Sequence, residues 1–98
     1  MAGPIHKLFR ASFSEAWYQL SKAEQDSLLK KVTDAGVKAG GTSVIVCDSS
    51  WASEEWQFFG LETYPSIEAV QKHNELLRGL DWFRYLKSST LLGTAMTV

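Results

Sequence analysis

The sequence predicts an α+β domain in which four strands and two long helices follow one another in the order βαββαβ. Four runs of alternating, β-branched or aromatic residues have the length of strands, and two longer stretches repeat apolar residues at helical spacing. Each helical stretch begins at a serine and ends near a glycine. A chain of 98 residues is the size of one domain, which we expect to span residues 1–98.

The first strand and the first long helix are marked by alternation and by capping residues. Apolar and polar side chains alternate in Ile5–Phe13, which predicts a strand. A connection over residues 14–20 leads to Ser21, which has Glu24 three residues later, the spacing of a capping box. The pair Gly40–Gly41 predicts the helix end, because glycine readily adopts the left-handed conformation needed there. The residues expected to form the buried stripe of this helix are Leu28, Leu29, Val32 and Ala35.

The second half of the chain repeats the pattern with a strand on each side of a helix. The apolar, β-branched run Thr42–Asp48 predicts a well-buried strand. A polar turn leads to a third strand over Glu55–Thr63. Ser66 is placed to cap the second long helix, which we expect to reach about Arg78. The fourth strand is predicted at Thr90–Met96.

This order of elements is that of a ferredoxin-like fold, a four-stranded antiparallel sheet with its helices packed on one face. Several strands carry large apolar side chains on both faces, so the face without helices also needs a cover. A second copy of the chain is the cover we expect, since symmetric dimers are the commonest oligomers. The prediction is therefore a homodimer with two sheets back to back, a dimeric α+β barrel.

Composition excludes several classes of partner. Ten Lys and Arg residues against eleven Asp and Glu leave a net charge of −1 without blocks of like charge, which disfavours nucleic acid binding. The single Cys47 allows no intrachain disulfide, as is typical of a cytoplasmic protein. No apolar run has the length of a membrane span or a signal peptide, so we expect no membrane partner. With two histidines and no glycine-rich phosphate loop, we expect no metal and no cofactor.

Three stretches of the sequence resemble darcynin-like proteins. Residues 15–24 (EAWYQLSKAE) are similar to the W-x-x-L-x-x-x-E entry to that family's first helix. Residues 60–63 (GLET) and 77–83 (LRGLDWF) resemble its W-E-T and L-R-D-T-x-F-W stretches. The sequence departs from the family in having Gly-Leu before Glu62 in place of an aromatic residue, and in the order of Trp82 and Phe83. The similarity extends over roughly residues 9–93.

The resemblance implies a place in the wider dimeric α+β-barrel superfamily. That superfamily includes cofactor-free monooxygenases, polyketide cyclases, muconolactone isomerases and haem-degrading enzymes. It therefore implies a small, often aromatic or polyketide-like ligand held between the sheet and the helices, and it implies no single reaction.

His73 is the first candidate catalytic residue. At helical spacing it lies near the middle of the apolar face of the second long helix, and we expect it to point toward the sheet. An imidazole there is suited to general acid or base catalysis near neutral pH. The alternative is a core histidine that is hydrogen-bonded to a backbone carbonyl or a buried water.

Arg10 and Asp48 are the other candidate catalytic residues. Together with Glu62 they lie on strands expected to be neighbours, where a buried charge needs a partner. In the functional interpretation Arg10 anchors a substrate carboxylate or phenolate, and a carboxylate orients His73. In the structural interpretation Arg10 forms an ion pair with Glu62 or Asp48.

Aromatic residues supply candidate walls for a binding site. The four substrate-binding candidates are Trp56, Phe58, Tyr64 and Trp82. Side chains of this kind also serve as core or interface residues. Trp51, in a polar loop, is expected to act as an entrance lid or a dimer contact.

Two functions from different classes follow. The first is a small cofactor-independent enzyme that uses acid–base chemistry on an aromatic or polyketide-like metabolite, as a cyclase, isomerase or monooxygenase. The second is a non-catalytic dimeric module that binds a small molecule or serves as an accessory subunit. A cavity at His73 favours the enzyme, whereas a filled core favours the module.

Overall fold

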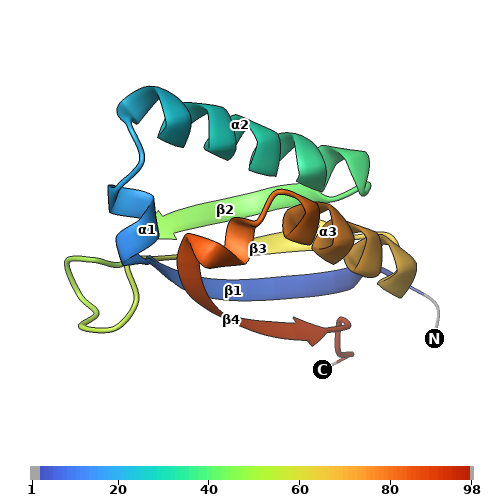
Figure 1. Cartoon of the computed structure of the whole chain (residues 1–98). Coiled ribbons are helices and arrows are strands. Elements are labelled where there is room, and N and C mark those ends of the chain that lie inside the picture. Colours follow the sequence, from blue (N-terminus) through green and yellow to red (C-terminus); the bar gives the residue numbers. More distant parts are fainter. Residues whose placement is uncertain (1–2, 98) are drawn as a thin grey trace.

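The computed structural model describes residues 3–97 and contains one four-stranded sheet with its helices on one face (Figure 1). The elements are β1 (Ile5–Phe13), α1 (Glu15–Tyr18), α2 (Lys22–Lys38), β2 (Thr42–Asp48), β3 (Phe58–Tyr64), α3 (Ile67–Gly79), the 3₁₀ helix η1 (Trp82–Arg84) and β4 (Leu86–Gly93). The strand order is β2-β3-β1-β4, and every neighbouring pair is antiparallel. The predicted ferredoxin-like α+β fold is confirmed.

The two predicted helix starts are confirmed by their caps. The Ser21 side chain accepts a hydrogen bond from the backbone N–H of Glu24, and the Glu24 carboxylate accepts one from the backbone N–H of Ser21. In the same way Ser66 accepts a hydrogen bond from the backbone N–H of Ala69 at the start of α3. Gly40 follows α2 with φ at 86°, so the expected left-handed helix end is also present.

The sheet register assigns alternate residues of β1 to opposite faces. Lys7 is opposite Glu62 of β3, and Phe9 is opposite Gly60. These residues face the helices, since Lys7, Phe9 and Glu62 all line the space beneath them. The residues between them on β1 therefore face the other side of the sheet. This parity decides which charged side chains reach the interior.

Three sequence expectations about the strands were wrong. β2 is an edge strand, and Val44, Ile45 and Val46 are 58%, 53% and 59% exposed, so its β-branched run is not well buried. An edge strand has a neighbouring strand on one side only, and Ile45 lies on the face of the sheet without helices. β3 begins at Phe58, three residues later than expected. β4 begins at Leu86, four residues earlier than expected, and pairs with β1 from His6 to Phe13.

The core lies between the sheet and the helices in two clusters. The larger joins Ala11, Trp17, Ala35, Leu77, Trp82 and Leu86. The smaller joins Ala39, Tyr64 and Val70. The short helix α1, which lies in the expected connection, places Trp17 in the larger cluster, where its ring stacks on that of Phe13.

The face of the sheet without helices is open and apolar. Four of its large side chains are exposed, namely Leu8, Ile45, Phe59 and Leu91. Leu8 is the central member, because it is opposite Leu61 of β3 and Leu91 of β4. Within residues 3–97 none of the helices combines the length and the apolar character that crossing a bilayer demands.

Candidate functional site

A cavity of about 400 Å³ lies between the sheet and the helices. Its walls come from α2, α3, η1 and the helix-facing side chains of all four strands. Most of the lining is apolar, with Phe9, Val32 and Leu77 among its members. Several lining residues are exposed, among them Val37 of α2, Val46 of β2 and Phe83 of η1, so the cavity is open to solvent. Figure 1 shows α2 lying over β2.

Four polar side chains meet in one part of the cavity wall. Lys7 Nζ is 3.2 Å from Nδ1 of His73, and the Tyr64 hydroxyl oxygen is 2.8 Å from the same nitrogen. The Tyr64 hydroxyl donates a hydrogen bond to Oε1 of Glu62 at 3.1 Å, and Lys7 Nζ is 4.0 Å from that carboxylate oxygen. We call these four residues the Lys7–Glu62–Tyr64–His73 cluster. Two strands and one helix therefore converge on a single imidazole nitrogen.

Local sequence features hold the cluster in place. Lys7 is on the inward face of β1, and only 6% of its surface is exposed. Tyr64 ends β3, is 1% exposed, and packs its ring directly against Gly41. A Cβ atom at position 41 would lie 2.4 Å from the Tyr64 ring, so only glycine permits this packing. His73 is 4% exposed on the inner face of α3.

Burial and charge determine the ionisation of the cluster. Burial, reinforced by the positive charge of Lys7, lowers the pKa of His73 from 6.5 to about 4, so the imidazole is neutral near pH 7. Burial also lowers the pKa of Lys7, and the carboxylate of Glu62 opposes this effect. Burial and the neighbouring Glu62 raise the pKa of Tyr64 well above 10, so its hydroxyl keeps its proton.

The second imidazole nitrogen of His73 faces the cavity. In residues 3–97 every fully buried side-chain nitrogen or oxygen atom has a hydrogen-bond partner. Nε2 makes no hydrogen bond to these residues, so it must be accessible from the cavity. Gly36 of α2 lies close to this nitrogen, since a Cβ atom at residue 36 would be 3.9 Å from Nε2. One nitrogen is thus held by the protein and the other is free to meet a ligand.

Four of the seven sequence-predicted site residues line the cavity. His73 and Tyr64 belong to the cluster, and Phe58 and Trp82 form apolar wall. The ring of Trp82 also makes an edge contact with the ring of Trp17, with 6.2 Å between the two centroids. These four residues come from β3, α3 and η1.

Arg10, Asp48 and Trp56 do not line the cavity. Arg10 is one residue out of phase with Phe9, so it lies on the open face of the sheet and donates a hydrogen bond to Ser89 Oγ at 3.0 Å. The expected ion pair with Glu62 or Asp48 is therefore not formed. Asp48 is exposed at the end of β2, where its carboxylate accepts two hydrogen bonds from Ser50 in a turn.

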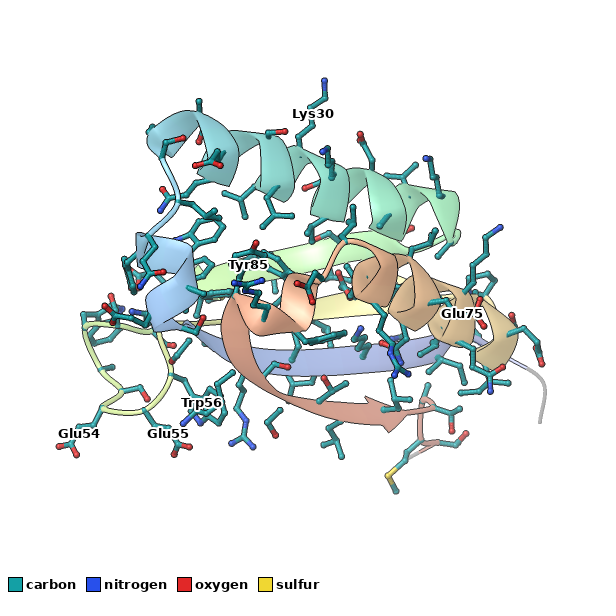
Figure 2. The ribbon with its side chains drawn as sticks, in the orientation of Figure 1. Lys30, Glu54, Glu55, Trp56, Glu75 and Tyr85 are labelled. Carbon is teal, nitrogen blue, oxygen red and sulfur yellow. The ribbon has the colours of Figure 1, made fainter. Side chains whose placement is uncertain are left out.

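Trp56 lies on the far side of the sheet from the helices, beside the loop that carries Glu54 and Glu55 (Figure 2). Its ring is contacted by two cations, the Arg10 guanidinium 5.1 Å and the Lys87 ammonium 4.9 Å from the ring centroid. The residue precedes β3, so the strand alternation that would have turned it inward does not apply. Trp51, in the same loop, is 83% exposed.

The cluster contains one residue that the sequence interpretation missed. Lys7 takes the place in the cavity that was expected for Arg10, as the cation beside His73. The signal was present in the sequence, since Lys7 shares the parity of Ile5 and Phe9 in the alternating strand. Glu62 was considered as a partner for Arg10 or as a carboxylate that orients His73, and in the structure it contacts Tyr64 and Lys7.

The cluster does not match the surroundings of a metal-bound histidine. Such a ring donates its second N–H to a carboxylate, carbonyl or water. Here Nδ1 of His73 faces the ammonium group of Lys7, which can only donate. Within residues 3–97 there is also no group of three His, Cys, Asp or Glu side chains that would hold a metal ion.

Comparison with known structures supports the fold. A chlorite dismutase variant from Candidatus Nitrospira defluvii matches 99% of this chain and 42% of its own, with a TM-score of 0.78 and 12% identity. A protein of unknown function from Rhodopseudomonas palustris matches 100% of this chain and 86% of its own, with a TM-score of 0.71 and 17% identity. The chain thus spans less than half the length of the chlorite dismutase it matches.

These likenesses support the four-stranded α+β architecture described above. At such low identity they show the architecture alone. No family model matches the sequence, and no curated protein matches it either. The resemblance to darcynin-like proteins therefore stays a prediction.

Proposed function

We propose that the protein is a small enzyme that binds an aromatic or polyketide-like molecule between its sheet and its helices and acts on it with His73. The observation that carries this proposal is the meeting of an apolar cavity of about 400 Å³ with a single buried polar cluster. Binding sites for small molecules have this form, a largely apolar recess with a few convergent polar groups.

The cavity lining matches a flat, apolar ligand. Phe9, Phe58 and Trp82 supply aromatic surface, and Val32 and Leu77 supply aliphatic surface on the helix side. A ligand seated against these side chains would direct a polar group toward the cluster, which provides the main charged part of the wall. This arrangement supports a planar molecule with one oxygen function.

The cluster supports acid–base chemistry. His73 is neutral near pH 7 and presents Nε2 to the ligand, while Nδ1 is held by Lys7 and Tyr64. Proton transfer at a phenolic, enolic or carbonyl oxygen is the step that such a group assists. Cyclisation, isomerisation and oxygenation of an electron-rich ring all pass through an oxyanion of this kind, and we propose a reaction of this group without a cofactor.

The alternative, a non-catalytic binding module, is disfavoured by the state of the cluster. A module with a filled core would have apolar side chains around His73. Instead, the buried Lys7 and the partly buried Glu62 lie beside it, and a stable core does not require these costly charges. Costly buried charges at a cavity are typical of functional sites.

The proposed active form is a homodimer that packs the open sheet face against its copy. That face exposes Leu8, Phe59 and Leu91, and a contiguous apolar patch of this kind is typical of an interaction surface. The cavity lies on the opposite side of the sheet, so dimer formation would leave it open to solvent. We expect the ligand site and the dimer surface to be independent.

Titration with 1-naphthol, followed by ¹H–¹⁵N NMR of the tryptophan indoles, tests the binding step. The Trp82 indole resonance should shift in a saturable manner, whereas Trp51, exposed in its loop, should not respond. Absence of a saturable shift at Trp82 across a panel of phenols and naphthols would argue against the proposed function. Once a substrate is found, His73→Ala should abolish turnover while the dimer persists.

A further inference from the structure

We infer that Lys7 fixes the tautomer of His73, so that the cavity presents an Nε2–H donor beneath Gly36 and selects ligands with an anionic or strongly accepting oxygen. The inference rests on the proposed function, since it specifies the ligand class of that same cavity. It also changes the role of His73, from a base that removes a proton to a donor that stabilises an oxyanion.

The position of the ring proton follows from the partners of Nδ1. An ammonium group has only hydrogen-bond donors, and a neutral imidazole has one donor nitrogen and one acceptor nitrogen. With Lys7 Nζ at 3.2 Å, Nδ1 must accept, and the ring must then carry its proton on Nε2. The Tyr64 hydroxyl, 2.8 Å away, has one proton, which goes either to Nδ1 or to Glu62, so Tyr64 alone selects neither tautomer. The charged ammonium group of Lys7 is therefore the neighbour of Nδ1 that favours the Nε2–H form.

Removal of the Lys7 charge would favour the opposite tautomer. The Glu62 carboxylate accepts the Tyr64 hydroxyl proton at 3.1 Å, which leaves the Tyr64 oxygen able to accept from Nδ1–H of His73. That chain of two hydrogen bonds places the imidazole lone pair on Nε2. The same cluster thus has two proton arrangements, and the ammonium group of Lys7 selects between them.

Apart from Lys7, Glu62 and Tyr64, no ionisable side chain of residues 3–97 lines the cavity around Nε2 of His73. Lys7 comes from β1, and Glu62 and Tyr64 come from β3. Lining residues from α2, β2 and β4 include hydroxyl groups, such as those of Thr33 and Thr90, but no charged side chain. The electrostatic character of the cavity around Nε2 is therefore set by one buried cation and one partly buried carboxylate.

Gly36 controls access to Nε2. A glycine inside a helix costs roughly 0.5–1 kcal/mol relative to alanine, and Gly36 lies in the last turn of α2, still within the helix. The Cβ position at residue 36 is 3.9 Å from Nε2, an ordinary contact distance. An alanine methyl would therefore fit without displacing His73, but it would occupy the space from which a ligand oxygen approaches this nitrogen.

The ligand class follows from the donor and the charge. An Nε2–H group beside a buried ammonium group favours an oxygen with negative charge, such as a phenolate or an enolate, over a neutral alcohol. A base role for Nε2 would create an imidazolium 3.2 Å from the Lys7 ammonium group. The low pKa of His73 agrees with this conflict. Stabilisation of an oxyanion requires no such pair of like charges.

The tautomer is tested on the free protein by ¹⁵N NMR of the labelled imidazole at pH 7.5. The wild type should show the Nε2–H form, and Lys7→Met should shift His73 to the Nδ1–H form. Lys30→Met is the matched control, because Lys30 projects from the outer side of α2 away from the sheet (Figure 2), and it should retain the wild-type tautomer. An Nδ1–H form in the wild type, or an unchanged tautomer in Lys7→Met, would overturn the inference.

The ligand class is tested with 4-nitrophenol, whose phenolate absorbs visible light, and with nitrobenzene as a probe that lacks the phenolic oxygen. The wild type should bind the phenolate at least about tenfold more tightly than nitrobenzene, and Gly36→Ala should abolish that preference without loss of stability. Equal binding of both probes in both proteins would refute the inference while supporting a ligand cavity. Binding of neither probe to the wild type would count against the cavity itself, and so against the proposed function.

Discussion

The hydroxyl oxygen of Tyr64 lies 2.8 Å from Nδ1 of His73, and the two rings are 5.2 Å apart between centroids. This contact connects the last residue of β3 with the inner face of α3. Because both side chains are buried, neither atom can replace a lost partner with bulk water. The contact between Tyr64 and His73 therefore connects α3 to the sheet and orients the imidazole toward the cavity.

Tyr64→Phe should lower the free energy of unfolding by about 1–3 kcal/mol, because it removes a hydroxyl between two buried polar groups. Tyr18→Phe is the matched control, since the Tyr18 hydroxyl accepts its hydrogen bond from Gln57 at an exposed site. We expect less than about 0.5 kcal/mol for that change. Urea unfolding of the three proteins measures the difference, and equal losses in both variants would contradict a structural role for the Tyr64 hydroxyl.

Gly41→Ala should lower the free energy of unfolding by about 1–3 kcal/mol, the range typical of an overpacked core. The added methyl would collide with the ring of the buried Tyr64 and lie 3.1 Å from the backbone oxygen of Gly36, so the ring or the backbone would have to shift. Gly79→Ala, at the end of α3, adds the same atom where nothing lies within 4 Å, and it should be neutral or slightly stabilising. Thermal unfolding compares the two, and a tolerated Gly41→Ala would show that the Tyr64 ring is less tightly confined than its packing indicates.

Acidification should destabilise the protein through His73. The pKa is about 4 in the folded state and 6.5 for an ordinary histidine, so between these values the unfolded chain binds a proton that the folded chain excludes. Stability therefore falls as the pH decreases from 6.5 toward 4, by at most about 3 kcal/mol. Unfolding free energies measured across this range should show the effect in the wild type.

One variant isolates that dependence from the titration of carboxylates. His73→Gln should be less sensitive to pH between 6.5 and 4 than the wild type. If His73→Gln keeps the full slope, the imidazole is not responsible for it.

Leu91→Glu should convert the expected homodimer to a monomer. Leu91 is among the most exposed apolar residues of the open sheet face, so a charge there should disrupt a dimer without unfolding the chain. Ile67→Glu, on the helix side, is the control and should remain dimeric. Analytical ultracentrifugation gives the masses. A wild type with the mass of one chain would show that a second copy of the chain does not cover the open face.

The helix arrangement could be predicted because its signals are local. Capping by Ser21 and Ser66, and the place of His73 on its helix, depend only on residues within one or two turns. The exposure of β2 could not be predicted in this way, since a β-branched run looks the same in a central strand as at an edge. Only the strand order β2-β3-β1-β4 assigns it to the edge.

The candidate site was predictable only in part, because the prediction depends on which residues of each strand face the helices. Phe58, Tyr64 and Trp82 were expected in the cavity wall, and they line it. Arg10 was considered as the cation of the site and Lys7 was not, although alternation from Phe9 places Lys7 inward and Arg10 outward. Trp56 was assigned to a strand that begins two residues after it, so no alternation applied.

The most direct test of the central claim is an NMR titration of the two imidazole side chains with 1-naphthol, with His6 as the internal reference. If the cavity binds its ligand at His73, the Nε2 resonance of that residue should shift to saturation while His6 stays unchanged. Unchanged resonances at both histidines, or equal shifts at both, would contradict a ligand site at the Lys7–Glu62–Tyr64–His73 cluster.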